Sequence, residues 1–386
     1  MNILIATETY LPYISGVAVS TDSIARYMVS QGHTVTVVAP TYNIDKPVTP
    51  MPGLKIVRIP SIPNPFYKGM ANAIFPFCIP SIEKVFKEQK FDIVHIQEPT
   101  AIGISALILA KKYKIPVVGA LHFTPEQISR MVPGKPEKLV SPIIRKYINI
   151  IYNKYDAIMV PTQTFAEFLI SDGVKKHIEV VSNGVDTSVF HPAAHNETVR
   201  KKLGIGKDNI VFFFLGRLEL DKNVITLIKA APFVGEKMKL LIVGVGKIEK
   251  TLHALARKLN VEDRIIWVKH ITDAEMPDYY HAADCFTIMS PYEVQSIVTL
   301  QAIASGLPVI AAHAGALPEL CRDHKNGFLV DTYDAKTLAV RMDELYHNKK
   351  MRDEFGAESR IISLAHNKRD VLHKLELLYE SLITKR

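Results

Sequence analysis

The segment from Ser290 to Ala304 (SPYEVQSIVTLQAIA) has the residue types and spacing that most clearly suggest chemistry. It joins an expected strand to an apolar helix, and the N–H groups that open a helix, together with its dipole, favour an anion. Glu293 lies before this helix start, and Gln301 follows it by eight residues. The residues expected at the helix start are Ser296, Ile297 and Val298. A carboxylate and an amide beside an anion site suit a ligand with phosphates in its middle and hydroxyls at both ends, such as a nucleotide sugar. The alternative is a plain connection with a solvated glutamate.

A second segment, Leu215 to Asn223 (LGRLELDKN), also follows an expected strand. Gly216 allows a close approach of the backbone to a ligand. Arg217 and Lys222 are five residues apart. Both could converge on a diphosphate, the arginine as a fork and the lysine as a point charge. The alternative is a pair of surface cations.

Two weaker candidates lie in the first half of the chain. The loop from Thr7 to Val17 has one glycine, Gly16, so it lacks the G-x-G-x-x-G pattern of a dinucleotide site. Its N–H groups, up to that of Val17, could still face a phosphate. His122 comes just after an expected strand and could hydrogen-bond a sugar hydroxyl. An ordinary loop and a buried core histidine are the alternatives.

The sequence favours no metal and no cofactor. It has no D-x-D triplet, the element with which metal-dependent sugar-nucleotide transferases hold a divalent cation on the diphosphate, and Pro192 separates His191 from His195. Lysine and arginine would then have to neutralise the diphosphate. The three cysteines are widely spaced and form no C-x-x-C pair, which argues against a zinc site or a disulfide framework and for a reducing compartment.

Two series of alternating strands and helices position these residues. Near-continuous apolar strands separated by helices predict parallel sheets covered on both faces. The fold class is therefore α/β, with two doubly wound Rossmann-like domains that face each other across a cleft, where ligands bind beyond the carboxyl ends of the strands. The predicted domains are residues 1–190 and 200–365, followed by a helical segment at 366–386. The expected strands are Asn2 to Ala6, Thr34 to Ala39, Lys55 to Ile59, Ile93 to Ile96, Pro116 to Leu121, Ile210 to Leu215, Lys239 to Val243, Ile265 to Val268, Cys285 to Met289 and Val309 to Ala311.

The net charge of +8 is unevenly distributed. The stretch from Lys111 to Lys154 holds nine basic and two acidic residues. Such a patch suits an anionic partner, lipid headgroups or nucleic acid, and we favour lipid; a solvated helix face is the alternative. Within it, Ser141 to Tyr155 predicts a helix with Ser141 as N-cap and Pro142 at its first position. Its candidate membrane or acceptor residues are Arg145, Lys146, Ile148 and Ile151, although such a stripe more often packs in a core.

The aromatic-rich stretch from Pro63 to Ile79 could line an acceptor channel or pack, and packing is favoured. The longest apolar run, Ala101 to Ala110, is about half the length that a bilayer span needs, so no transmembrane helix is expected. No secretory signal is expected either, because Glu8 interrupts the apolar start and no basic residues precede it.

Taken together, the motifs resemble those of glycosyltransferase family four, the retaining group with the GT-B fold. The resemblance covers almost the whole chain, and within the family ALHFTPE and the opening segment look most similar to bacterial lipid hexosyltransferases such as diacylglycerol glucosyltransferases. The matching segments, in family order, are TETYLPYISGV, GHTVTVV, DIVHIQEP, SNGVDTSVFHP, LGRLELDKN, the block from Glu293 through SGLPVIA to LPEL, and NGFLV.

The resemblance implies roles for particular residues. Gly16 would approach the donor phosphates, and His122 would contact the 6-hydroxyl region of the sugar. Arg217 and Lys222 would neutralise the leaving diphosphate, while Glu293 would hold the 3- and 4-hydroxyls. The N–H groups of Ile297 and Val298 would bind phosphate, and the final helix would cross back to the first domain.

Two residues depart from the family pattern. Gln301 stands where the family has a glutamate that holds the ribose hydroxyls, and Ser296 stands where it usually has glycine. A neutral amide is a weaker partner for a hydroxyl than a carboxylate, so donor affinity or nucleotide preference is what these changes affect.

The resemblance implies a retaining, metal-independent hexosyltransferase that moves glucose from a UDP-linked donor to a lipid such as diacylglycerol. We expect it in the cytoplasm, peripheral to the inner membrane face, with no nucleic-acid partner. One alternative is transfer of mannose or another hexose from a GDP-sugar to a polysaccharide or phospholipid. Others are a sugar-nucleotide epimerase or hydrolase, and a weakened nucleotide-sugar-binding protein.

Overall fold

The computed structural model describes residues 1–43, 48–65, 69–130 and 137–385. They form two compact units, which we call unit 1 (Met1–Ser182 with Arg369–Arg386) and unit 2 (Asn183–Lys368). The sequence placed the join near residues 191–203, where prolines and alanines break the pattern. The chain joins unit 2 earlier, because the N–H of Val185 donates to the carbonyl of His366 and the N–H of Lys368 donates back to Val185, both at 2.9 Å.

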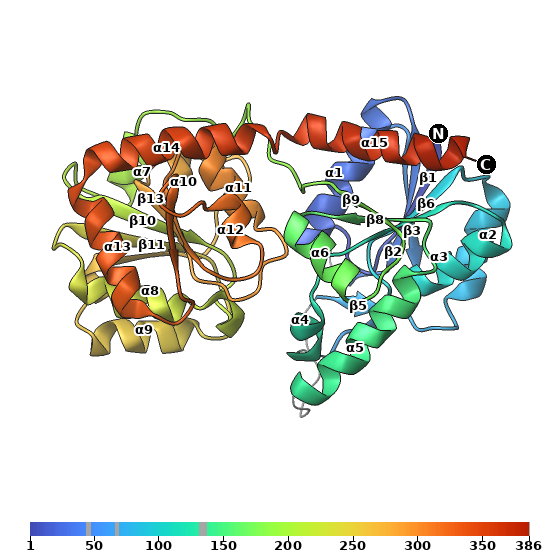
Figure 1. The fold of residues 1–386 in the computed structure, drawn as a ribbon, viewed down its shortest axis with the longest axis horizontal. Coiled ribbons are helices and arrows are strands. Elements are labelled where there is room, and N and C mark those ends of the chain that lie inside the picture. The colour runs from blue at the N-terminus through green and yellow to red at the C-terminus, as the bar shows by residue number, and fades with distance from the viewer. Residues whose placement is uncertain (44–47, 66–68, 131–136, 386) are drawn as a thin grey trace. The chain divides into compact units, whose positions relative to one another are not determined.

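Unit 1 is built on a parallel sheet of seven strands in the order β3-β2-β1-β6-β7-β8-β9 (Figure 1). The chain runs outward from β1 to β3 and then returns to the other side of β1 with β6. The β1/β6 pair is therefore the switch point of this sheet, the place where ligands bind in open α/β folds. The strands are β1 (Asn2–Ala6), β2 (Thr34–Pro40), β3 (Leu54–Ile59), β6 (Ile93–Ile96), β7 (Val117–Ala120), β8 (Ala157–Val160) and β9 (His177–Val180), and β4 (Ile62–Pro63) pairs with β5 (Ala71–Asn72).

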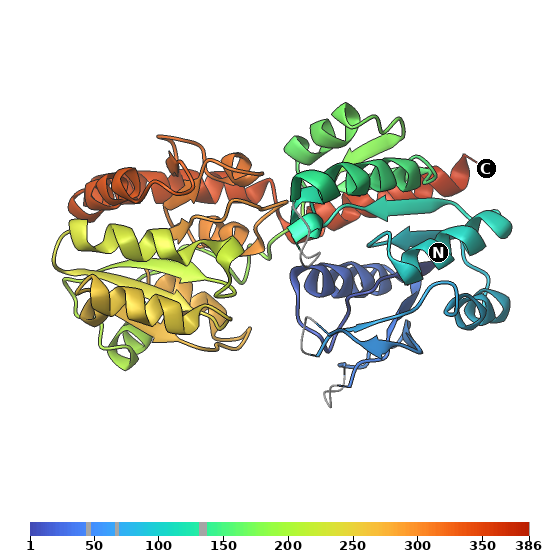
Figure 2. The same cartoon turned by 90° about the horizontal axis from the view of Figure 1, so that it is seen from below.

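Helices cover both faces of the unit 1 sheet (Figures 1 and 2). On one face, Ile24 and Met28 of one helix and Leu375 of the last helix are buried with apolar strand residues in a single core. The last helix thus packs on unit 1, where its Tyr379 and Glu376 also bond to His95 and His33. The helices are α1 (Gly16–Ser30), α2 (Ile79–Glu88), α3 (Ala101–Lys112), α4 (Pro125–Arg130), α5 (Glu137–Tyr152), α6 (Gln163–Ser171) and α15 (Lys368–Thr384).

Unit 2 repeats the design with a parallel sheet of six strands in the order β12-β11-β10-β13-β14-β15. Its switch point is the β10/β13 pair, and helices again lie on both faces (Figure 2). The strands are β10 (Ile210–Leu215), β11 (Met238–Val243), β12 (Ile265–Val268), β13 (Cys285–Ile288), β14 (Val309–Ala312) and β15 (Gly327–Val330). The helices are α7 (Glu197–Lys202), α8 (Val224–Ala230), α9 (Glu249–Lys258), α10 (Met276–His281), α11 (Ile297–Ala304), α12 (Leu317–Leu320), α13 (Ala335–His347) and α14 (Lys349–Leu364), with 3-10 turns at Leu220–Lys222, Ala231–Phe233 and Glu262–Arg264.

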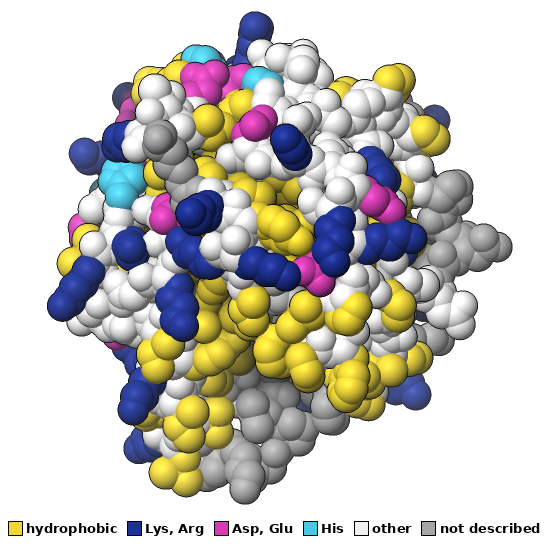
Figure 3. Space-filling model, turned by 90° about the vertical axis from the view of Figure 1, so that its right-hand side faces the viewer, with side chains coloured by type: hydrophobic (Ala, Val, Ile, Leu, Met, Phe, Trp, Pro, Cys, Tyr) yellow, Lys and Arg dark blue, Asp and Glu magenta, His cyan; other side chains and the backbone are white. Residues whose placement is uncertain are grey.

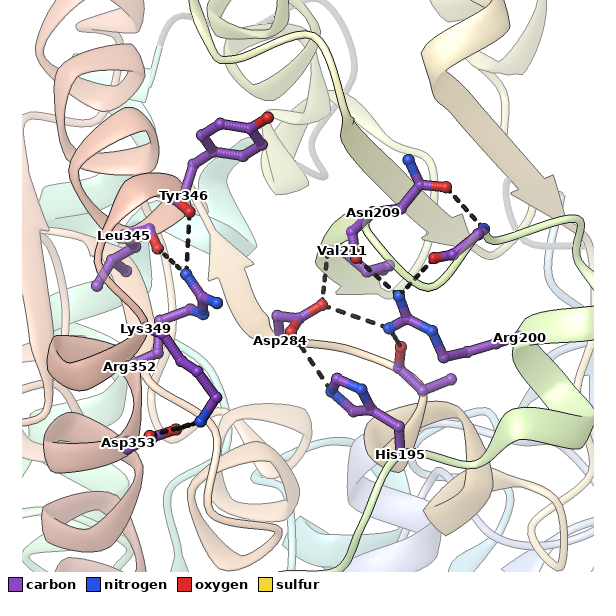
Figure 4. A network of polar contacts seen from close by, with 12 residues as sticks. His195, Arg200, Asn209, Val211, Asp284, Leu345, Tyr346, Lys349, Arg352 and Asp353 are labelled. Carbon is purple, nitrogen blue, oxygen red and sulfur yellow. Dashed lines mark hydrogen bonds and ion pairs between the residues drawn. The ribbon is translucent and has the colours of Figure 1, made fainter.

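A buried ion network ties the amino ends of the unit 2 strands together (Figure 4). Arg200 of α7 is 1% exposed and donates to the carbonyls of Ala282 (2.9 Å), Gly206 (3.1 Å) and Asn209 (2.7 Å). It also lies 3.4 Å from Asp284, which accepts from the N–H of Val211 at 2.8 Å. This network lies at the edge opposite to the carboxyl ends, so it supports the sheet and leaves the other edge for ligands.

The predicted start of α5 is wrong. The helix begins at Glu137, so Pro142 lies inside it, and Ser141 does not cap it. The buried hydroxyl of Ser141 instead donates to the carboxylate of Glu126 at 3.3 Å. Proline removes only one helical hydrogen bond, and the buried side chains of Ile148 and Tyr152 hold the helix against the sheet.

Candidate functional site

The carboxyl edge of the unit 2 sheet brings Lys222 and Glu293 together. Lys222 ends the 3-10 turn after β10, and Glu293 lies in the loop after β13. The Lys222 ammonium is 2.5 Å from Oε1 of Glu293, with the two side chains 19% and 12% exposed. A half-buried pair of opposite charges at the switch point can serve a ligand that carries both phosphates and hydroxyls.

Asn223 locks these two loops to each other. It adopts the left-handed conformation with a φ of 50°, which asparagine tolerates better than most residues. Its amide donates to the carbonyls of Met289 (3.1 Å) and Thr332 (2.6 Å). From the facing loop, the hydroxyl of Ser290 donates to the carbonyl of Asp221 at 3.0 Å. Only the cations Arg217 and Lys222, which precede Asn223, were predicted from the sequence, although the position of Asn223 directly before a helix was a usable signal.

Gly315 fixes the backbone of Glu293 from a third loop. A Cβ atom on Gly315 would lie 2.6 Å from the carbonyl oxygen of Glu293, and its φ is +54°. The same carbonyl accepts from the N–H of Ala316 at 2.9 Å. Only a glycine permits this approach, so the loop after β14 holds the backbone of Glu293 in place.

Arg217 is the exposed cation of the site. It follows β10, its side chain is 59% exposed, and its guanidinium lies 3.2 Å from the carboxylate of Asp221. An exposed pair of this kind contributes little to stability. Arg217 is therefore available to exchange Asp221 for an anionic ligand.

Helix α11 begins where the sequence predicted it, with Ser296, Ile297 and Val298 at its start. The N–H groups of Ile297 and Val298 open the helix and have no acceptor within it. Ser296 is the N-cap, and its hydroxyl oxygen accepts from the N–H (3.3 Å) and the hydroxyl (2.8 Å) of Thr299. Both lone pairs of Ser296 are thus used, which leaves its own O–H to donate.

Gln301 is engaged within the protein. Its side-chain oxygen accepts from the hydroxyl of Tyr280 at 3.0 Å, and the same hydroxyl lies 2.9 Å from the carbonyl of Val298. Tyr280 is fully buried and packs against Phe213 and Phe286. A ligand hydroxyl at Gln301 would therefore meet an amide whose oxygen is already bonded to Tyr280, a contact that the sequence did not reveal.

In unit 1, Gly16 opens α1 directly after the N-cap Ser15, whose hydroxyl accepts from the N–H of Ala18 at 3.1 Å. A Cβ atom on Gly16 would meet nothing within 4 Å, and its φ is not positive. Neither packing nor backbone strain requires this glycine, which leaves open space beside the helix start. The side chain of Val17 is buried in the core, so only its backbone could face a ligand.

His122 lies just beyond β7 and is half-buried. Its Nε2 atom is 2.7 Å from Oε1 of Gln97, which follows β6 and is fully buried. Burial lowers the pKa of His122 to about 4. The imidazole is therefore neutral at ordinary pH and suited to a hydroxyl. Gln97 was not predicted as a site residue, although it is a polar residue at the carboxyl end of the strand beside β1.

Two predicted membrane residues have other roles. Ile148 is 3% exposed and belongs to the core. Arg145 forms ion pairs with Glu126 (2.5 Å) and Asp172 (2.8 Å), so its charge is already compensated. The prediction was wrong for Ile148, because this side chain packs in the core, and the role of Arg145 stays a prediction. Ile151 is half-buried and Lys146 is exposed.

The exposed apolar residues of α5 form another stripe. Leu139, Ile143, Tyr147 and Ile150 are 67%, 70%, 43% and 49% exposed. Their spacing of three and four residues places them on one helix face. We call this set the α5 stripe.

The described aromatic side chains of the stretch at 63–79 are also exposed. Phe75 and Phe77 are 47% and 79% exposed, so the favoured packing interpretation is wrong for them. Phe66 and Tyr67 lie outside the described residues, as do the side chains of Arg130, Lys135 and Glu137 from the basic stretch.

In the described parts of the chain, no group of three or more histidine, cysteine, aspartate or glutamate side chains is placed to hold a metal ion. Over the same residues, no helix has the length and apolarity needed to cross a membrane.

Comparisons with known proteins identify the family of the chain. The family model for Glycosyltransferase Family 4 matches residues 14–189, and that for Glycosyl transferases group 1 matches residues 195–361. The alpha-monoglucosyldiacylglycerol synthase of Streptococcus pneumoniae is 30% identical over 337 residues, which cover 85% of this chain and 75% of that protein.

Solved structures share the fold. Sucrose-phosphate synthase from Thermosynechococcus elongatus superposes with a TM-score of 0.85 at 18% identity, over 100% of this chain and 99% of that one. HepE from Anabaena, solved with UDP and glucose, gives a TM-score of 0.79 at 17% identity, over 99% and 100% of the two chains. With both family models matched in order on two Rossmann-like units, the chain belongs to glycosyltransferase family 4 and is a glycosyltransferase of the GT-B fold.

Proposed function

We propose that this glycosyltransferase transfers glucose from UDP-glucose to a lipid hydroxyl, with diacylglycerol as the acceptor, and retains the configuration of the sugar. The observation that carries the proposal is the 30% identity to a protein named as an alpha-monoglucosyldiacylglycerol synthase, over most of both chains. The donor site would lie at the carboxyl edge of the unit 2 sheet.

The arrangement of unit 2 supports a nucleotide-sugar donor. Glu293 offers a carboxylate to sugar hydroxyls, and the helix start at Ile297 and Val298 offers N–H groups to a phosphate. Arg217 and Lys222 supply positive charge from the neighbouring loop. The chemistry of the donor, hydroxyls at its ends and phosphates between, matches this order of groups.

In the proposed reaction, the acceptor hydroxyl attacks on the face from which the nucleotide departs. Its proton passes to the leaving phosphate oxygen as the sugar–phosphate bond breaks. Arg217 and Lys222 stabilise the negative charge that develops on the diphosphate, so no metal ion and no strong side-chain base is needed.

The surface of unit 1 supports a lipid acceptor and a peripheral position at the inner membrane face. The α5 stripe is exposed, and Lys138 and Lys146 on the same helix are also exposed. Figure 3 shows hydrophobic side chains gathered on one face of unit 1 with lysine and arginine side chains beside them. Apolar residues next to cations are typical of a surface that lies on an anionic membrane.

The experiment is a donor panel of UDP-glucose, UDP-galactose, GDP-mannose and ADP-glucose, each with vesicles that do or do not contain diacylglycerol. Product mass identifies the sugar and the lipid. We expect a hexosyl-diacylglycerol from UDP-glucose. A product only from GDP-mannose would establish the mannosyl alternative, and donor breakdown without acceptor would indicate a hydrolase. Donor binding without turnover would indicate a binding protein.

A further inference from the structure

A chain of buried polar groups runs through unit 1 from α15 to His122. The hydroxyl of Tyr379 lies 2.6 Å from Nδ1 of His95. The amide nitrogen of Gln97 lies 3.3 Å and 3.2 Å from Nδ1 and Nε2 of the same ring. The amide oxygen of Gln97 lies 2.7 Å from Nε2 of His122. Tyr379, His95 and Gln97 are all 0% exposed.

The chemistry of the glutamine amide gives this chain a direction. The Gln97 nitrogen can only donate, and whichever ring nitrogen of His95 lacks a proton accepts from it. The Gln97 oxygen can only accept, so Nε2 of His122 must carry the proton. In a neutral imidazole, Nδ1 of His122 is then an unprotonated acceptor, and no described residue is bonded to it.

The groups around His122 keep it neutral. Burial lowers the pKa of His122 to about 4, and burial followed by the charge of His122 lowers the pKa of His95 to about 3. Burial also raises the pKa of Tyr379 well above its ordinary value. Among the described residues, no carboxylate is bonded to this chain, so nothing in it favours an imidazolium.

We propose that Gln97, held by His95 and Tyr379, is a positioning residue that fixes the tautomer of His122, so that Nδ1 accepts a hydrogen bond from a hydroxyl of the sugar donor. His122 follows β7 at the carboxyl edge of the sheet, where ligands of such folds bind. A neutral acceptor at this place selects a hydroxyl and disfavours a phosphate or a carboxylate, which would need a donor. This inference rests on the proposed donor, UDP-glucose.

The test compares Gln97→Met, which removes both amide groups, with Gln97→Glu, which keeps an acceptor for Nε2 of His122. Gln97→Met is expected to lower kcat/KM for UDP-glucose by about 10- to 100-fold at every pH, because the ring loses its orientation. Gln97→Glu should recover part of this loss at high pH. As the pH falls it should lose activity again, because a carboxylate favours the imidazolium, which has no free acceptor.

Monodeoxy donors give a readout that a merely structural role would not change. In the wild type, removal of the hydroxyl that His122 contacts should lower kcat/KM by about 10-fold or more. In Gln97→Met the same removal should cost much less. Tyr155→Phe is the matched control. The buried hydroxyl of Tyr155 has no hydrogen-bond partner in the described part of unit 1, and it does not belong to the hydrogen-bonded groups that link Tyr379 to His122.

Histidine tautomers can be read directly by carbon and nitrogen NMR of the labelled protein, without any substrate. A proton on Nδ1 of His122 would overturn the inference, as would equal deoxy-donor penalties in the wild type and Gln97→Met. An inactive wild type with the Nε2–H tautomer would instead contradict the proposed function and leave the tautomer assignment standing.

Discussion

The ammonium of Lys222 lies 2.5 Å from the carboxylate of Glu293 and joins the loops that follow the two strands at the switch point of unit 2. Each charge is compensated by the other before a ligand arrives. A donor that presents hydroxyls to the carboxylate and phosphate oxygens to the ammonium can replace this pair without leaving either charged group without a hydrogen-bond partner. The Lys222–Glu293 pair therefore suits a ligand that carries both hydroxyl and phosphate groups.

The Lys222–Glu293 pair predicts non-additive kinetics. Lys222→Met and Glu293→Gln should each lower kcat by about 100-fold or more. Each removes a group that contacts the donor in the transition state, Lys222 at the leaving diphosphate and Glu293 at the sugar hydroxyls. The double variant should lose much less than the product of the two effects, since residues in direct contact act together. Steady-state kinetics of all four proteins measures this. Fully multiplicative losses would show that the two residues act independently.

The variant Arg217→Ala should lower turnover without changing the stability of the fold. Its side chain is 59% exposed, so Arg217→Ala should change the free energy of unfolding by less than about 0.5 kcal/mol. Turnover should fall by about two orders of magnitude or more. Arg257→Ala is the control, because Arg257 is also 59% exposed and pairs with Glu262 at 3.3 Å. Near-normal turnover of Arg217→Ala would contradict the assignment of this residue to the diphosphate.

The variant Gly16→Ala tests whether the donor phosphates approach the start of α1. Gly16→Ala places a methyl group in open space, so the melting temperature should not fall. Donor KM should rise by about 10-fold or more if the phosphates approach this helix start. Gly32→Ala is a contrasting variant, because Gly32 has a φ of +85°, and it should lose stability while its kinetics stay normal. An unchanged donor KM in Gly16→Ala would remove Gly16 from the site.

The network in Figure 4 predicts a dependence of stability on pH. Burial would raise the pKa of Asp284, but bonds from His195 and Val211 and the charge of Arg200 together hold that pKa below its usual value. A carboxyl with a lowered pKa stabilises the fold above its ordinary value of about 4, and this contribution is lost as the pH falls through the folded pKa. Arg200→Met should therefore cost about 3–5 kcal/mol at pH 7, and less near pH 3. Urea unfolding at both values measures this, and a cost that does not change with pH would contradict it.

The α5 stripe predicts membrane binding through unit 1. Ile143→Glu with Ile150→Glu should abolish cosedimentation with anionic vesicles, because both side chains are exposed and apolar. Ile361→Glu in unit 2 is the matched control, since Ile361 is 61% exposed. Binding of the wild type should weaken with salt. Equal binding of all three proteins would place the membrane surface elsewhere.

Most strands could be predicted because buried parallel strands consist of continuous apolar residues. Asn2–Ala6, Ile93–Ile96, Ile210–Leu215 and Ile265–Val268 agree with their predicted bounds. The edge strand β9 was missed because it contains the polar His177 and Glu179, one face of an edge strand being open to water. The edge strand β15 begins with Gly327, which has no side chain and so weakens the apolar pattern of a strand.

The site could be predicted by residue type but not by its internal contacts. Position after a strand identified Arg217, Lys222, Glu293 and His122. Sequence patterns carry no information on which distant side chains meet, so the pairs Lys222–Glu293, Gln97–His122 and Tyr280–Gln301 emerged only with the fold. For α5, the apolar periodicity predicted a helix. Apolar residues lie on more than one face of this helix, so the sequence left open which face is buried.

Transfer of glucose to diacylglycerol can be followed through the product that forms from carbon-labelled UDP-glucose and diacylglycerol vesicles. Mass spectrometry and the anomeric coupling constant in NMR identify the lipid and its linkage. We expect an α-linked glucosyl-diacylglycerol, with donor consumption that requires diacylglycerol. A β-linked product, or donor breakdown at the same rate without diacylglycerol, would contradict it.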